Sequence, residues 1–293
     1  MTPLPAELLA KIDALELEAR QVVEGHLAGR HKSPQFGFAV EFAQHREYSP
    51  GDDIKHIDWK VYGRTERYHL KQYEQETNLV AWMLVDASES MKVRSGERSK
   101  YETACRAAAA LAFLILQQTD SVGLATFDKT VRHFLRPSAR AGNHYRELLR
   151  LLLDGPTDRP ANTGAMVDEL AGRLGRRGIV FLFSDLLDDV PPLVEGIRHL
   201  KYQKHEVIVI QVLDAAEMDF PFRHPTLFKG LEEWPELNTD PLSVREEYLK
   251  GFIQHLAEIE AACRTLECDY VRLRTDADVG QELATYLLKR LER

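Results

Sequence analysis

Short, strongly apolar segments alternate with longer amphipathic ones along most of this chain. An unbroken apolar run is typical of a strand buried on both faces of a sheet, and apolar residues at helical spacing are typical of a helix that covers such a sheet. The alternation predicts an α/β fold with a doubly wound, mostly parallel sheet and right-handed crossovers. The predicted strands lie in the segments NLVAWMLVD, SVGLATFD, TVRHFLR at an edge, GIVFLFSD, HEVIVIQVLD and CDYVRLR.

Two segments depart from this rhythm. From Gly29 to Glu76 the chain mixes charged, aromatic and turn-forming residues, which predicts short strands and ordered loops. Between Asp214 and Thr239 it is rich in proline and aromatic residues, which predicts a packed excursion or a small hairpin. We expect an N-terminal helix with a strand-and-loop extension over residues 1–78 and an α/β domain over residues 79–293. The predicted helices span Pro5 to about Gly25, Ser99–Gln118, Gly142–Leu153, Gly164–Leu174, Pro191–Tyr202, Val244–Leu266 and Val279–Leu291.

The composition is that of an ordinary globular protein, with 44% hydrophobic and 29% charged residues among 293. A formal net charge of -8 disfavours a dedicated nucleic-acid binder, because such proteins normally present a basic surface to phosphates. A local basic run from Arg132 to Arg146 keeps nucleic-acid attachment open as an alternative. The three cysteines, Cys105, Cys263 and Cys268, lack the paired spacing of a zinc site, so we expect buried free thiols.

The sequence also bears on cellular location. No apolar stretch approaches the roughly 20 residues that span a bilayer. The first residues include early acidic side chains and lack the basic, apolar and small-residue pattern of a secretory signal. We expect a cytoplasmic protein that neither crosses nor enters membranes by itself.

Polar residues at the ends of the predicted strands are the candidates for chemistry, because ligands collect beyond the carboxyl ends of strands in a doubly wound sheet. The central strand runs into the D-x-S-x-S pattern of Asp86, Ser88 and Ser90, whose oxygens can converge on one point. Asp185 follows a second strand, and Thr163 begins the helix before that strand. Hard divalent cations such as Mg²⁺ take about six oxygen ligands and usually keep several waters, so these side chains make a plausible partial shell.

This set resembles the metal-ion-dependent adhesion site of von Willebrand factor A domains. The resemblance implies that Asp86, Ser88 and Ser90 form the first metal loop, Thr163 the second and Asp185 the third. It also implies a divalent metal, with Mg²⁺ favoured and Mn²⁺ or Ca²⁺ as alternatives, and an open coordination place that a partner's acidic side chain completes. Asp, Ser and Thr also cap helices and shape turns without any ion, and that reading stays open for each residue.

The segment ahead of the sheet carries a second resemblance, which extends over nearly the whole chain. It resembles the signature of the bacterial family called domain of unknown function 58, whose members combine the signature with a von Willebrand factor A-like fold. Many members are encoded beside MoxR-type AAA+ ATPases, which implies such an ATPase as a partner. The matching residues are Gly29–Ser33, Gly37-Phe38, Glu41-Phe42, Arg46–Asp53, Ile57–Lys60 and Gly63-Arg64.

The signature itself has two interpretations. The structural one expects Trp59 to be largely buried and, with Asp58, to anchor the extension on the α/β body. The functional one expects a second polar site on the extension, although mixed charges on loops are usually a solvated or salt-bridged face. The residues of that second site would be His31, Arg46, Asp52, Asp53, Asp58 and Arg64.

We expect a non-enzymatic, metal-dependent protein-binding module that works with a MoxR-type AAA+ ATPase in assembling or remodelling a client protein. The alternative is a metal-assisted hydrolase that uses the same Asp and Ser residues, for which no nucleophile-and-base pair has support in the sequence. No catalytic residue is predicted.

Overall fold

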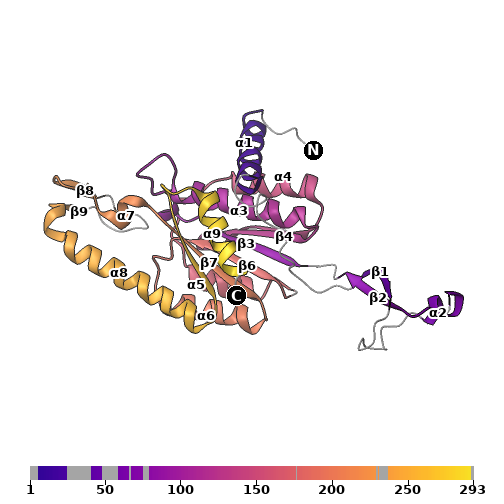
Figure 1. Cartoon of the computed structure of the whole chain (residues 1–293). Helices are drawn as coiled ribbons and strands as arrows, with labels where there is room; N and C mark the ends of the chain where they lie inside the picture. Colours follow the sequence, from indigo (N-terminus) through magenta and orange to yellow (C-terminus); the bar gives the residue numbers. More distant parts are fainter. Residues whose placement is uncertain are drawn as a thin grey trace. The chain divides into compact units, whose positions relative to one another are not determined.

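The structure is a computed structural model, and it describes residues 6–24, 41–47, 59–65, 67–74, 79–175, 177–228, 230 and 237–291. The chain divides into two compact units, one of residues 1–32 and 80–293 and the other of residues 33–79. The boundary predicted after residue 78 falls close to this division. The N-terminal helix, which was predicted with the extension, belongs instead with the α/β body (Figure 1).

The larger unit is built on one mixed sheet with the strand order β10-β7-β6-β3-β4-β5. Neighbouring strands are parallel except β4 and β5, which pair antiparallel at the edge. The prediction of a doubly wound, mostly parallel sheet is confirmed, and each strand lies where the apolar pattern placed it. The strands are β3 (Val80–Asp86), β4 (Ser121–Phe127), β5 (Val131–Ser138), β6 (Ile179–Ser184), β7 (Glu206–Leu213) and β10 (Asp269–Arg274).

Helices cover both faces of this sheet (Figure 1). One group packs around α3, whose run of buried alanines lets the helix lie close to the strands. The other group, α5, α6 and α8, covers an apolar cluster centred on Trp82, Leu84 and Leu182. The helices are α1 (Ala6–Val22), α3 (Lys100–Gln117), α4 (Ala141–Leu152), α5 (Thr163–Ala171), α6 (Val190–Tyr202), α8 (Pro241–Thr265) and α9 (Val279–Leu291).

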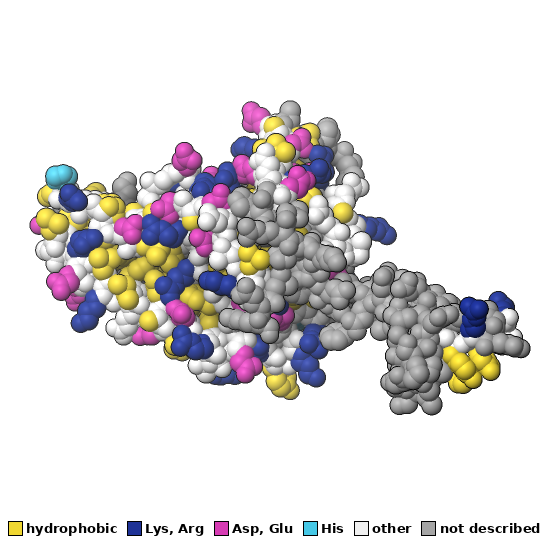
Figure 2. Space-filling model, in the orientation of Figure 1, with side chains coloured by type: hydrophobic (Ala, Val, Ile, Leu, Met, Phe, Trp, Pro, Cys, Tyr) yellow, Lys and Arg dark blue, Asp and Glu magenta, His cyan; other side chains and the backbone are white. Residues whose placement is uncertain are grey.

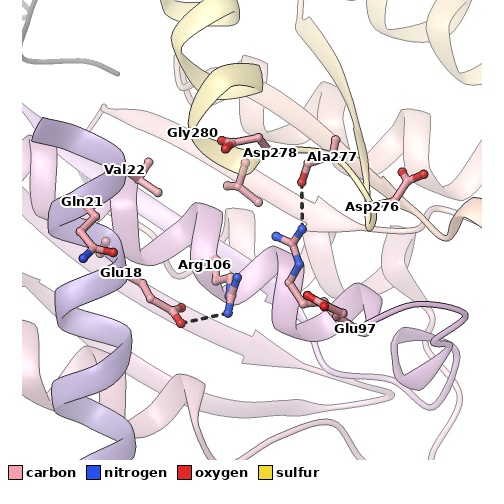
Figure 3. Close-up of a pocket in the computed structure, with 12 residues that line it drawn as sticks. Glu18, Gln21, Val22, Glu97, Arg106, Asp276, Ala277, Asp278 and Gly280 are labelled. Atoms are coloured by element: carbon pink, nitrogen blue, oxygen red, sulfur yellow. Dashed lines mark hydrogen bonds and ion pairs between the residues drawn. The ribbon is translucent and has the colours of Figure 1, made fainter. Parts of the chain in front are cut away.

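The N-terminal helix α1 docks on α3 and α4 through buried side chains, which explains its place in the larger unit. Its buried residues are Ile12, Leu15, Ala19 and Val23, the last just past its end. Beside it lies a cavity of about 570 Å³ between α1, α3 and the start of α9, where Arg106 donates to Glu18 at 2.9 Å (Figure 3). The cavity is lined by Glu18, Ala19, Gln21, Val22, Glu97, Arg98, Arg106 and residues 276–280.

The segment rich in proline and aromatic residues forms α7 (Ala215–Asp219) and the antiparallel pair β8 (Thr226–Phe228) and β9 (Leu237–Thr239), which confirms the predicted excursion. Phe220 lies at its centre, with ring centroids 5.2 Å from Phe222 and 4.7 Å from Tyr248 of α8. Figure 2 shows hydrophobic side chains gathered on the side of the molecule where α7 and α8 lie.

The smaller unit contains the antiparallel strands β1 (Glu41–Glu47) and β2 (His69–Glu74) and the helix α2 (Trp59–Thr65). The prediction that Trp59 is buried is wrong, because its side chain is 63% exposed and makes an edge contact with Tyr62. Tyr62 in turn stacks on Tyr68 at 4.5 Å. Of the suggested second polar site, Arg64 lies in α2 and is exposed. His31, Asp52, Asp53 and Asp58 and the side chain of Arg46 lie outside what the structure describes.

Cys105, Cys263 and Cys268 are free and buried, as expected. Among the described residues, no helix has the length and apolar character needed to cross a membrane.

Candidate metal centre

The carboxyl ends of β3 and β6 bring two of the predicted metal loops together. The strands pair in parallel with Val85 opposite Phe183, so the residues that follow, Asp86 and Ser184, end adjacent strands. Asp185 comes directly after β6, and Thr163 opens α5. Ser90 begins the short 3₁₀ turn Ser90–Lys92 after the first loop. The parallel pairing therefore places Asp86 and Asp185 at one edge of the sheet.

Asp86 is the centre of the hydrogen bonding at this edge. One carboxylate oxygen accepts a hydrogen bond from the Ser184 hydroxyl at 2.6 Å and a longer one from the Thr163 hydroxyl at 3.4 Å. The other oxygen accepts from the backbone N–H of Ser88 at 2.9 Å. The hydroxyls of Ser88 and Ser90 are 3.1 Å apart. The structure thus joins Asp86 directly to Thr163 and to the loop that carries both serines.

Asp185 is held from another direction. Its Oδ2 accepts a hydrogen bond from the ammonium of Lys100 at 2.7 Å, and its Oδ1 accepts a long one from the backbone of Leu187 at 3.4 Å. Gln211 donates to its backbone carbonyl at 2.7 Å. Lys100 is fully buried and also donates to Glu217 at 2.6 Å. The third predicted ligand is therefore one of three charged groups joined through Lys100, with Asp185 and Lys100 buried and Glu217 partly buried.

Burial raises the pKa of Asp86 to about 7, and the nearby charge of Asp185 adds to the shift, while hydrogen bonds from Ser184 and Ser88 partly offset it. Burial also raises the pKa of Glu217, against the effect of Lys100. Burial works to lower the pKa of Lys100, but the Asp185 and Glu217 carboxylates outweigh it and hold that pKa above its usual range. The edge therefore concentrates acidic groups, and among the described residues Lys100 is the one buried cation that offsets them.

Backbone contacts brace the three loops against one another. The N–H of Glu89 donates to the carbonyl of Arg159 at 2.9 Å, and the N–H of Thr157 donates to that of Ala87 at 2.8 Å. The N–H of Thr163 donates to the carboxylate of Asp188 at 2.8 Å. The first loop is thus tied to the segment before α5, and the start of α5 is tied to the third loop.

The donor set fits a hard divalent cation. Carboxylate and hydroxyl oxygens are the ligands that Mg²⁺ prefers, and it completes a shell of about six oxygens with water. Within the described part of the chain, no group of three or more His, Cys, Asp and Glu side chains is placed to hold a metal. A metal here would therefore depend on hydroxyls and water beside Asp86 and Asp185, with Ser88, Ser90 and Thr163 as the hydroxyl donors.

A family model described as "Protein of unknown function DUF58" matches residues 44–258. This chain belongs to the DUF58 family. Its own topology has the von Willebrand factor A-like arrangement that the sequence predicts, with a mostly parallel sheet, helices on both faces and the D-x-S-x-S loop at the carboxyl end of the strand β3.

This DUF58 chain is similar to several mycobacterial proteins. The uncharacterized proteins Mb1516 of Mycobacterium bovis and Rv1480 of Mycobacterium tuberculosis are each 27% identical over 292 residues, covering 97% of this chain and 90% of theirs. Uncharacterized protein MAV169 of Mycobacterium avium is 25% identical over 163 residues, covering 53% of this chain and 94% of its own length.

Among solved structures, BatB from Bacteroides thetaiotaomicron is similar at 17% identity and a TM-score of 0.46, covering 73% of this chain and all 100% of its own. The von Willebrand factor A domain of SpRpn10 is similar at 15% identity and a TM-score of 0.43, and the match covers 72% of this chain and 95% of the SpRpn10 domain.

Sequence reasoning missed Ser184 and Lys100, which contact Asp86 and Asp185 directly, and Glu217, which contacts Lys100. Ser184 had a signal, because it immediately precedes Asp185 at the end of a predicted strand. Lys100 and Glu217 lie 117 residues apart, and only the fold brings them together.

Proposed function

We propose that this DUF58 protein is a metal-dependent protein-binding module. A divalent cation, Mg²⁺ in the first place and Mn²⁺ or Ca²⁺ as alternatives, is held by Asp86, Ser88, Ser90, Thr163 and Asp185, and an acidic side chain of a partner completes its shell. The observation that supports the proposal is the convergence on Asp86, whose carboxylate is contacted from the first loop, from Thr163 and from the end of β6.

The charge balance supports a cation at this place. A buried carboxylate with a raised pKa is costly to ionise, and a second carboxylate beside it adds repulsion. A divalent cation reverses both effects, because its charge favours the ionised form of each ligand. The protein's own donors leave part of a shell of about six oxygens to water and to the partner.

The partner proposed is a MoxR-type AAA+ ATPase, together with a client protein that the two assemble or remodel. Family membership supports this choice through the genes that often lie beside those of DUF58 proteins. A metal-assisted hydrolase would use the same residues, but no observation favours it. Asp86 is hydrogen-bonded by Ser88, Thr163 and Ser184, and no described histidine contacts it.

The test is partner association measured by titration calorimetry with a MoxR-type ATPase from the same organism. We expect binding in millimolar Mg²⁺, at least about tenfold weaker binding in excess chelator, and a similar loss for Asp86→Ala. Circular dichroism should show that Asp86→Ala is folded, because the change also relieves crowding of acidic groups.

The matched control is Asp189→Ala, which removes an exposed carboxylate near the third loop and should bind like the wild type. If Asp86→Ala and the chelated wild type both bind as tightly as the metal-loaded protein, the partner surface lies elsewhere.

A further inference from the structure

Lys100 occupies an unusual position for a lysine. It is the first residue of α3, its side chain is fully buried, and its ammonium lies between Asp185 at 2.7 Å and Glu217 at 2.6 Å. Lysine is almost never fully buried unless it is paired. The start of α3 does not require it, because Ser99 and Glu102 already form the capping box there. The lysine is therefore explained by the carboxylates it joins rather than by the helix.

We propose that Lys100 is a tethered cation that competes with the divalent metal for Asp185, and that Glu217 sets how strongly it competes. The inference rests on the proposed metal site. Asp185 directs one oxygen to Lys100, and among the described residues its other oxygen has the single 3.4 Å contact from the backbone of Leu187. A metal that takes Asp185 as a ligand, directly or through water, must share this carboxylate with the ammonium.

The charges determine the direction of each effect. The ammonium repels an incoming cation and holds one of its ligands, so Lys100 weakens metal binding. Glu217 offsets the ammonium charge and takes part of its hydrogen bonding, so Glu217 strengthens metal binding. Lys100 contacts Asp185 directly, whereas Glu217 acts on Asp185 through Lys100.

Glu217 also connects this competition to neighbouring helices. Its second carboxylate oxygen accepts from the backbone N–H of Asp214 at 2.9 Å and closes the capping box of α7. Tyr248 of α8 donates to its backbone carbonyl at 3.1 Å. The position of Glu217, and with it the pairing of Lys100, is therefore fixed by α7 and α8.

The experiment measures the affinity for Mn²⁺ by titration calorimetry at constant ionic strength in the full chain. We expect Lys100→Met, which keeps the length of the side chain without its charge, to bind Mn²⁺ about tenfold more tightly than the wild type. We expect Glu217→Gln to bind about tenfold more weakly, because the ammonium is then less offset. The double variant should bind more tightly than Glu217→Gln and at least as tightly as the wild type.

Controls separate this role from a structural one. Lys250→Met and Glu247→Gln make the same changes on the exposed side of α8 and should leave the affinity unchanged. A structural role would weaken Mn²⁺ binding in both single variants at Lys100 and Glu217, and that result would overturn the inference.

If Lys100→Met does not fold, the decisive comparison is between Glu217→Gln and the double variant, which keeps the net charge of the three groups unchanged. An unchanged affinity between these two would also overturn the inference. A wild type that binds no Mn²⁺ at millimolar concentration would overturn the proposed metal site itself, and this competition with it.

Discussion

At the residue scale, Asp86 carries the strongest electrostatic signal among the predicted ligands. It is fully buried at the end of β3, and its pKa is raised to about 7 by burial and by Asp185. The unfolded chain has the ordinary value of 3.8, so between these values the folded state keeps a proton that the unfolded state has lost. Stability contributed by this proton is present at low pH and is lost as pH rises toward about 7.

We therefore expect the contribution of Asp86 to the free energy of unfolding of the metal-free protein to fall by roughly 1 kcal/mol per pH unit between about pH 4 and pH 7. Urea titrations of the wild type and Asp86→Asn across this range, in excess chelator, measure the difference. The dependence should shrink in the variant and in saturating Mg²⁺. An identical pH profile for the two proteins would show that Asp86 is ionised throughout.

The spacing of Asp86, Ser88 and Ser90 was enough to predict their grouping, because alternate residues of a tight loop after a strand share one side. The placement of Asp185 and Thr163 beside that loop was predicted from the rule that parallel strands end at the same edge of a sheet. Lys100 could not be predicted, because the first residue of a helix is normally solvated and its burial depends on Glu217, which comes from a later crossover.

At the element scale, the apolar pattern predicted every strand of the main sheet, since each is buried on both faces or forms an edge. The ends of the helices were predicted less accurately. The helix predicted from Val244 begins at Pro241, because Asp240 caps it and proline fits its first turn. The helix predicted to reach Leu174 ends at Ala171, where Gly172 follows. These ends depend on local capping rather than on the periodic pattern.

The close packing of α5 on α6 positions Thr163. A Cβ added at Gly164 would lie 2.4 Å from a backbone carbon of Pro192. Because the contact is with backbone rather than with a flexible side chain, one of the two helices would have to shift to remove the clash. We expect Gly164→Ala to lower the free energy of unfolding by about 1–3 kcal/mol and to weaken metal binding, because Thr163 must move with the helix. Gly142→Ala on α4, where nothing lies within 4 Å of the added atom, is the control. Equal denaturation midpoints for the two variants would show that this contact adjusts freely.

At the scale of the whole molecule, the chain combines an α/β body that bears the candidate metal centre with a separate unit of residues 33–79 that bears part of the family signature. The exposure of Trp59 could not be predicted from sequence, because a large indole among mixed charges is equally compatible with a core and with a surface. The exposed indole gives no support to the interpretation of this residue as a buried anchor.

The melting temperature of the full chain shows whether the α/β body binds a divalent cation through Asp86. A ligand that binds only the folded state stabilises it by mass action, and about 1 kcal/mol shifts the midpoint of a domain of this size by roughly 2–4 °C. We expect millimolar Mg²⁺ or Mn²⁺ to raise the melting temperature relative to excess chelator in the wild type and in Asp189→Ala, and to leave Asp86→Ala unchanged. No rise in the wild type, or an equal rise in Asp86→Ala, would show that no cation stabilises the folded chain through Asp86.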